Sequence, residues 1–104
     1  MLLLNIEYIP GKKIEALGIA KGSVVQSKNF GKDFMAGMKT LVGGELKSYT
    51  DMMDQARALA TQRMEQEAEA LGADAVVNIR YSSASVMQGA AEVMAYGTAV
   101  RFKG

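Results

Sequence analysis

The stretch VGGELKSYTD in the middle of the chain carries residue types that can bind an anion. Gly43 and Gly44 allow backbone N–H groups to approach a ligand ahead of a helix, and Tyr49 can stack on a ring or donate a hydrogen bond. A phosphate-binding loop, however, places its last glycine directly before Lys and Ser or Thr, whereas five residues separate Gly44 from Thr50. The spacing therefore favours the end of one helix, a tight turn, and a second helix capped by Ser48 or Thr50.

Two arginines and another tyrosine are further candidates for ligand binding. Arg57 falls in a predicted helix and Arg80 in a predicted strand, and a guanidinium binds a carboxylate or a phosphate through paired hydrogen bonds. Either arginine can instead form a salt bridge within or between subunits. Tyr96 precedes Gly97, whose missing side chain leaves space for a subunit contact or a small ligand. The candidate ligand-binding residues are therefore Gly43, Gly44, Tyr49, Arg57, Arg80 and Tyr96.

The composition excludes several kinds of catalytic and metal site. The 104 residues include no histidine and no cysteine, so the chain cannot build a Ser-His-Asp triad or a zinc site of the usual ligands. Glu45, Asp51 and Asp54 lack the spacing of a calcium loop, and acidic residues at a helix start are explained by the helix dipole. We predict no catalytic residue, no metal site and no cofactor.

Methionine is the residue type that is left to hold a soft metal ion. The chain has eight methionines, and thioether sulfur suits Cu(I) and similar ions. They are scattered along the sequence, and the closest pairs, Met35 with Met38 and Met52 with Met53, fit core or interface packing. Metal binding through methionine is therefore an alternative, not the preferred interpretation.

Charge and hydropathy bound the partners of the chain. A net charge of +1 gives no basic stripe of the kind that nucleic-acid binders carry. The first residues, MLLLNIEYIPG, are too short an apolar run for a membrane span and lack the basic start of a signal peptide. We therefore expect no nucleic-acid partner and no membrane span. The absence of cysteine is compatible with a cytoplasmic protein.

Apolar periodicity predicts the elements of the first half of the chain. Residues 2–8 alternate as in a strand, which a Pro-Gly pair ends in a turn. Residues 12–28 predict a second strand that is apolar on both faces, and Gly18 and Gly22 within it indicate a bulge or a close approach of another backbone. Residues 28–42 have the apolar spacing of a short helix.

The second half begins with the strongest periodicity in the sequence. Residues 50–71 predict a long helix. Its apolar stripe consists of Met53, Ala56, Ala60, Met64, Ala68 and Leu71. Gly72 should end this helix in a left-handed conformation. Residues 75–81 then predict a strand, residues 82–90 a loop of small polar residues, and residues 91–103 a final strand.

The predicted order is β-β-α-α-β-β in a single domain of residues 1–104. This order indicates an α+β fold, with an antiparallel sheet and two helices, one of them long, packed on it. The last strand carries Gly97 and apolar side chains on both sides, so its second face needs a cover that a chain of this size cannot supply. The sequence therefore predicts a homo-oligomer.

Several stretches taken together resemble the YbjQ family, which is described as a "putative heavy-metal-binding" domain of unassigned function. They are IPGKKI with LGIAKGSVV, NFGKDFMAG, LVGGELKSYT, ARALA with MEQEAEALGADAVVNIRY, and EVMAYGTAV. The resemblance extends over essentially the whole chain, and the first residues, MLLLN, depart from it. It implies a dodecin-like subunit assembled in a ring of five copies. In such a ring, one arginine per subunit gives a ring of charges near the axis.

These observations favour a small homo-oligomer, a homopentamer if the resemblance holds, that is not an enzyme. It would bind an unidentified small ligand or a partner where its subunits meet. A heavy-metal-binding protein that uses methionine is the first alternative. An enzyme with a cleft between subunits is the second, although no residue pair marks a general acid and base.

Overall fold

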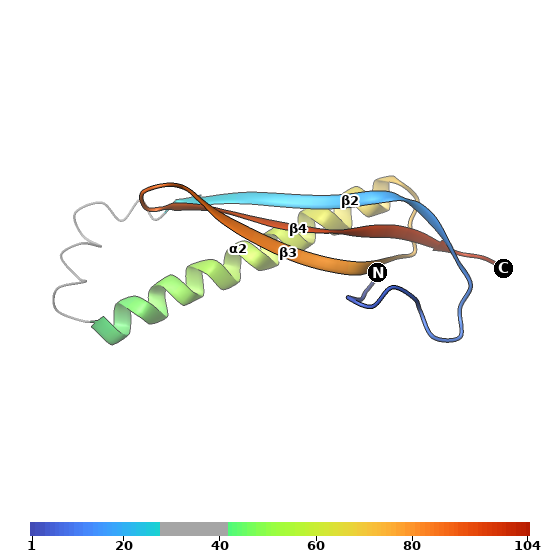
Figure 1. Cartoon of the computed structure of the whole chain (residues 1–104), viewed down its shortest axis with the longest axis horizontal. Coiled ribbons are helices and arrows are strands. Elements are labelled where there is room, and N and C mark those ends of the chain that lie inside the picture. The colour runs from blue at the N-terminus through green and yellow to red at the C-terminus, as the bar shows by residue number, and fades with distance from the viewer. Residues whose placement is uncertain (28–41) are drawn as a thin grey trace.

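The computed structural model describes residues 1–27 and 42–104. These residues form an α+β fold in which a long helix covers one face of a four-stranded sheet (Figure 1). The elements are β1 (Leu2–Leu3), β2 (Ile14–Ser27), α2 (Val42–Ala70), β3 (Ala75–Met87) and β4 (Ala90–Phe102). The fold class predicted from the sequence is confirmed. The helix predicted over residues 28–42 lies outside the described residues, apart from Val42.

The sheet is mixed, whereas the sequence analysis predicted an antiparallel sheet. Its strand order is β1-β3-β4-β2, with β4 antiparallel to β2 and β3, and β1 parallel to β3. The first strand, predicted over residues 2–8, is two residues long. Beyond it, the Leu4 N–H donates to the Val76 carbonyl at 2.9 Å and the Ile79 N–H to the Leu4 carbonyl at 3.1 Å. Apolar alternation predicts an extended chain, but it specifies neither the partner strand nor its direction.

α2 begins at Val42, well before the predicted start at Thr50. Gly43, Gly44 and Tyr49 therefore lie in its first turns, and the prediction that the two glycines end a helix and open a turn is wrong. Glycine disfavours a helix by only about 1 kcal/mol per residue. The packing of the rest of this 29-residue helix on the sheet outweighs that cost.

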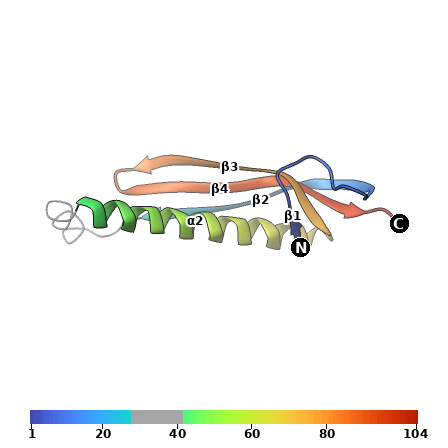
Figure 2. The same cartoon turned by 90° about the horizontal axis from the view of Figure 1, so that it is seen from below.

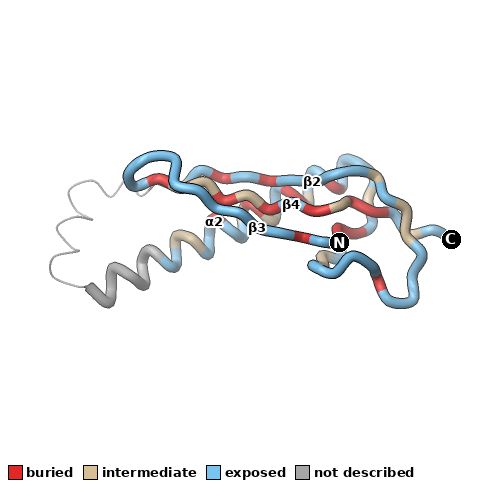
Figure 3. Tube along the Cα trace, viewed as in Figure 1, coloured by how far each residue is buried: buried red, intermediate tan, exposed pale blue. Residues whose placement is uncertain are grey.

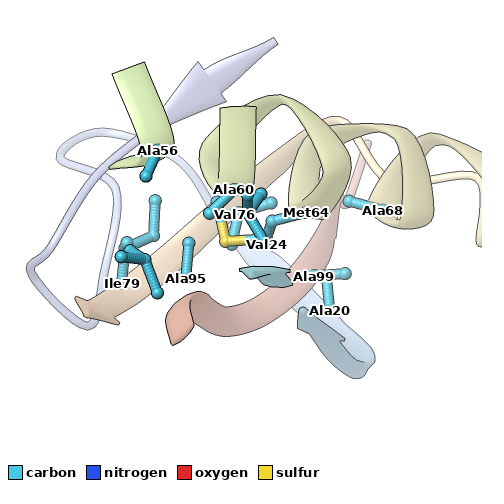
Figure 4. Close-up of a cluster of buried hydrophobic side chains, with 11 residues drawn as sticks. Ala20, Val24, Ala56, Ala60, Met64, Ala68, Val76, Ile79, Ala95 and Ala99 are labelled. Carbon is cyan, nitrogen blue, oxygen red and sulfur yellow. The ribbon is translucent and has the colours of Figure 1, made fainter. Parts of the chain in front are cut away.

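The core between α2 and the sheet is built mainly from small side chains, as Figure 4 shows. Four α2 residues are fully buried against the sheet: Ala56, Ala60, Met64 and Ala68. The sheet residues that they meet are Ala20, Val24, Val76, Ile79, Val93, Ala95 and Ala99. Gly22 sets the closest approach, because a Cβ built on it would lie 2.3 Å from the Ala60 carbonyl oxygen. The close approach at Gly22 is confirmed, and so is the predicted apolar stripe except at its end, because Leu71 lies beyond α2 and is exposed.

The C-terminal end of α2 is also as predicted. Gly72 adopts a left-handed conformation with φ of 81°. Its N–H donates to the Glu69 carbonyl at 2.9 Å, and the N–H of Ala73 donates to the Ala68 carbonyl at 3.1 Å. These two bonds form a Schellman motif, which satisfies carbonyls at the helix end and turns the chain towards β3.

β3 and β4 form a long hairpin. β3 continues to Met87, so the loop predicted over residues 82–90 is wrong, and the turn consists of Gln88 and Gly89. Small polar residues have a low strand propensity, but β4 offers them a partner along the whole length of β3. The strand predicted over residues 91–103 is β4, displaced by one residue.

The register of the sheet shifts at three places, one of which lies between Ser85 and Met87 beside the hairpin turn, and two of which lie further from that turn. In β2 the shift lies between Ala16 and Gly18, and Gly18 has φ of 144°, which confirms the bulge predicted there. In β3 the shift further from the turn lies between Val77 and Arg80, where Asn78 has φ of 57°. Each bulge inserts one extra residue, so the side chains that follow it change faces.

Candidate functional site

The face of the sheet opposite α2 is largely exposed, as the two layers in Figure 2 and the burial in Figure 3 show. We call this surface the open face. Its residues are Ile19, Lys21, Ser23 and Val25 of β2, Arg80, Ser82 and Ala84 of β3, and Glu92, Met94, Tyr96 and Thr98 of β4. Ile19 is 72% exposed, Val25 60% and Tyr96 38%. Large apolar side chains left this exposed on neighbouring strands are typical of a contact surface.

The N-terminal segment covers one end of the same side of the sheet (Figure 2). Ile9 is buried against Val77 and Val100. The Lys12 N–H donates to the Ile9 carbonyl at 3.0 Å, and Gly11 between them has φ of 76°, so the predicted Pro-Gly turn is confirmed. The chain thus covers one end of the second face itself, and the open face begins where that cover stops.

Arg80 lies where the N-terminal segment leaves β3. Its Nη1 donates to two backbone carbonyls, those of Asn5 and Ile79, each at 3.1 Å. These two bonds fix the orientation of the guanidinium. Among the described residues, no carboxylate lies within salt-bridge distance of Arg80. A guanidinium that is held in place without an acidic partner is suited to bind an anion.

Two cavities meet at Arg80. The larger has a volume of about 770 Å³ and is lined by Leu3, Leu4, Asn5, Ile6, Ile79, Arg80 and Tyr81. The smaller has a volume of about 290 Å³ and is lined by Asn5, Ile6, Glu7, Tyr8, Asn78 and Arg80. The larger volume falls in the range of small-molecule sites, which combine an apolar lining with a few polar groups. Here the charged group is the guanidinium of Arg80, and Asn5 and Tyr81 are the other polar residues of the lining.

Tyr81 connects the wall of the larger cavity to α2. The Tyr81 hydroxyl lies 2.7 Å from Oγ1 of Thr61. The Thr61 hydroxyl in turn donates to the Arg57 carbonyl at 2.7 Å. Because a threonine hydroxyl has one proton, Tyr81 is the donor to Thr61. This bond holds the phenol of Tyr81 against the helix side of the cavity.

Lys21, Tyr96 and Arg80 form one row of the open face. Lys21 of β2 and Arg80 of β3 both oppose Tyr96 of β4 in the strand register. Opposed residues of antiparallel strands have Cβ atoms about 4.5–5.5 Å apart, so two cationic residues flank one phenol. The space expected at Gly97 is filled from within the chain, since a Cβ there would lie 2.8 Å from Cγ1 of Val76.

Of the residues that the sequence analysis put forward, Arg80 and Tyr96 are brought together, facing one another across β3 and β4. Arg57 lies apart from them, exposed on α2 and paired with Asp54. The remaining three candidates lie in the first turns of α2, namely Gly43, Gly44 and Tyr49. Within one chain the predicted residues therefore do not all lie together, and their role in binding stays a prediction.

Sequence reasoning missed the residues around Arg80. Asn5 and Ile6 were expected in a regular strand, and Lys21 was not considered for binding. Strand alternation puts Lys21 on the side of the sheet opposite Gly22, which was available from the sequence. The register that brings it to Tyr96 depends on pairing between distant strands, and a single sequence carries little signal for that.

An ion pair joins β2 to β4 near the C-terminal end of the sheet. Nη2 of Arg101 donates to Oε2 of Glu15 at 2.9 Å, and the two residues are directly opposed. The hydrogen bond from Arg101, and then its charge, lower the pKa of Glu15 below its ordinary value. The same contact raises the pKa of Arg101. Arg101 thus already has a carboxylate, in contrast to Arg80 within the described part of the chain.

Residues 1–27 and 42–104 contain no group of three acidic residues placed to hold a metal ion. Over the same ranges, no helix is both long enough and apolar enough to cross a membrane. Met52 and Met53 are half-buried on α2, and Met64 is fully buried in the core. The other methionine pair considered from the sequence, Met35 with Met38, lies outside the described residues.

Known proteins match the chain over its whole length. A family model described as "Putative heavy-metal-binding" matches residues 1–103. The chain belongs to the YbjQ family. A UPF0145 protein of Clostridium novyi is 61% identical over 101 residues, which are 97% of this chain and 98% of that protein. A UPF0145 protein of Thermus thermophilus is 54% identical over 104 residues, 99% of this chain and 91% of its own length.

A solved structure shares the fold of this YbjQ-family chain. It is a protein of unknown function from Pediococcus pentosaceus that belongs to the DUF74 family. The TM-score is 0.71 at 16% sequence identity, and the match covers 99% of this chain and 98% of the other. At this identity the likeness concerns the fold alone. The family resemblance inferred from the sequence is confirmed, and the α+β architecture has a solved counterpart.

Proposed function

We propose that this YbjQ-family protein is a non-enzymatic homo-oligomer that binds a small ligand or a partner where its subunits meet. The open face carries the proposal, because Ile19 and Val25 expose 72% and 60% of their surface on it. Burying such apolar surface against a second copy is favourable. Lys21, Tyr96 and Arg80 of the open face then supply polar groups at the contact.

The outer edge of β2 supports the same assembly. β2 is 14 residues long and is the last strand of the sheet, so among the described residues its outer side has no strand partner. At one position, Oε1 of Glu67 accepts a hydrogen bond from the Lys21 N–H at 3.2 Å. A long edge strand with little other protection pairs readily with another chain. One neighbouring copy can therefore cover the open face and this edge together.

The assembly that we propose is a ring of five copies with a dodecin-like arrangement of each subunit. A ring repeats one contact around an axis and leaves no free end, so every copy has its open face covered. The number five comes from the family resemblance. We place the protein in the cytoplasm, where a cysteine-free chain needs no oxidising environment.

Native mass spectrometry of protein purified without a chelator tests this proposal. We expect a mass five times the 11.1 kDa of one chain. In the double variant Ile19→Lys with Val25→Lys, two charges on the open face should dissociate the ring. Gln62→Lys with Gln66→Lys is the control, because it adds the same two charges at exposed positions of α2. A wild-type monomer, or a ring that survives the double variant, would refute the open face as the interface.

The same spectra separate the alternatives. Heavy-metal binding has the family description in its favour, and it predicts an extra mass that a chelator removes. An organic ligand predicts an extra mass that survives chelation. No specific observation favours an enzyme with a cleft between subunits.

A further inference from the structure

Of the three guanidinium nitrogens of Arg80, Nη1 alone makes hydrogen bonds within the described residues. Nη1 is occupied by the carbonyls of Asn5 and Ile79, both part of the chain around the cavity. The remaining N–H groups, on Nη2 and Nε, have no recorded acceptor among the described residues. They lie side by side on one edge of the guanidinium and match the two oxygens of a carboxylate. The fixed Nη1 orients that edge in advance, which reduces the entropy lost on binding.

The cavity next to Arg80 is lined mainly by apolar side chains, and Asn5 lies beside the charge as a further polar residue. Leucine and isoleucine side chains from β1, β3 and the N-terminal segment supply most of its lining, with Tyr81 at one side. Its volume of about 770 Å³ exceeds what a lone carboxylate fills. An apolar wall beside a single guanidinium suits a ligand with one anionic end and a hydrocarbon body.

We propose that this cavity binds an amphipathic monocarboxylate, with its carboxylate on Nη2 and Nε of Arg80 and its hydrocarbon part against Leu4, Ile6 and Ile79. The assignment rests on the proposed ligand-binding function and gives it a ligand class. A phosphate fits less well, because its higher charge calls for several donors and one guanidinium is present. Tyr81, tied to Thr61 on α2, closes the cavity on the helix side.

A carboxylate of a neighbouring copy is the competing occupant. It would use the same edge of Arg80, and other side chains of that copy would then have to fill the cavity. The two occupants also differ in measurable ways, since a neighbour's carboxylate depends on the assembly and a free ligand does not.

Calorimetric titration of the whole protein with decanoate and with 1-decanol tests the proposal. Both probes have the same chain length and differ in the carboxylate. We expect decanoate to bind at least tenfold more tightly than the alcohol. Arg80→Met should weaken decanoate about ten- to hundredfold and leave the alcohol unchanged, as the loss of a charge-assisted hydrogen bond requires.

Two further variants control the comparison. Arg101→Met removes an exposed guanidinium that already has a carboxylate partner, and it should leave decanoate binding unchanged. Ile6→Glu places a negative charge in the cavity and should weaken decanoate; Ile6 is 41% exposed, so this variant is expected to fold. The two variants together separate a specific site from a general effect of charge.

Three results would overturn the site: no decanoate binding to the wild type at millimolar concentration, equal affinity for the alcohol, or no effect of Arg80→Met on decanoate. A change in subunit number on Arg80→Met, seen by native mass spectrometry, would assign the guanidinium to an interface and also overturn it. A monomeric wild type that still binds decanoate through Arg80 would instead refute the oligomer and retain the site.

Discussion

Replacing Gly22 with alanine tests whether close packing of α2 on β2 holds this fold together. A Cβ at Gly22 would lie 2.3 Å from the Ala60 carbonyl oxygen and 2.3 Å from the Met64 backbone nitrogen. It would also lie 2.7 Å from Cβ of Arg63. Two of these three atoms are helix backbone, so no side-chain rotation relieves the clash. The helix must therefore move away from the strand.

The size of that movement sets the cost. The contacts must lengthen from 2.3 Å to at least 3.0 Å, a displacement of about 0.7 Å. A gap of this size forfeits about a quarter to a half of the dispersion energy across it, and it opens between the sheet and four fully buried residues of α2. Overpacking costs about 1–3 kcal/mol when side chains can adjust. Because backbone must move here, we expect a loss of about 3 kcal/mol or more.

A competing effect acts in the opposite direction but is smaller. Alanine restricts the unfolded chain more than glycine does, which stabilises a protein by about 0.4–1 kcal/mol where the native conformation permits it. The steric cost therefore exceeds this gain. The expected net loss of about 2 kcal/mol or more corresponds to a fall in Tm of at least about 8–16 °C for a domain of this length.

Urea unfolding and thermal unfolding at fixed protein concentration measure this loss. Gly104→Ala is the control, because a Cβ there meets nothing within 4 Å, and it should change stability by less than about 0.5 kcal/mol. Wild-type stability in Gly22→Ala would refute the reasoning. It would mean that α2 can shift on β2 without loss, so that the alanine-rich contact does not set the stability of the fold.

Two further predictions concern polar contacts. Arg101→Gln should raise the pKa of Glu15 towards its ordinary value, because the donor and the charge that lower it are gone. A pKa that is lower in the folded state than in the unfolded state stabilises the fold at pH values above the unfolded-state pKa. This stabilisation is lost as the pH falls through the folded-state pKa, so the stabilities of wild type and variant should converge in acid. An NMR titration of Glu15 with an unchanged midpoint would contradict this. Tyr81→Phe removes the hydrogen bond to Thr61 and should cost about 0.5–1.5 kcal/mol in urea unfolding. Tyr8→Phe, at a residue 58% exposed, is the matched control, and equal losses would refute a role for the bond.

The features that sequence analysis predicted well are those with local causes. The stripe of Ala56, Ala60 and Met64 recurs at helical spacing, so burial of one face follows from the pattern itself. Gly72 ends α2 because a left-handed residue is cheapest at glycine. The alternation of β4 is regular, and the structure buries one side of it against α2 as the pattern requires.

The features that sequence analysis missed depend on pairing partners that are distant in the sequence. Residues 82–87 form part of a strand only because β4 pairs with them. Simple alternation would put Ile14 and Ala20 on one face, but the bulge at Gly18 separates them: Ala20 packs under α2, and Ile14 packs with the N-terminal segment. Gly18 indicated a bulge from the sequence, but the sequence analysis did not include the change of face of the side chains that follow it.

The bulge at Asn78 has the same effect on the candidate site. Val77 packs with the N-terminal segment, so in a regular strand Ile79 would share that face and Arg80 would point at α2. The extra residue reverses both: Ile79 is 7% exposed in the core, and Arg80 lies on the open face. Asparagine adopts the required left-handed conformation at low cost, and Gly97 opposite leaves room for the side chains that converge there. Asn78 and Gly97 together therefore keep a guanidinium out of an alanine-rich core and place it beside a cavity.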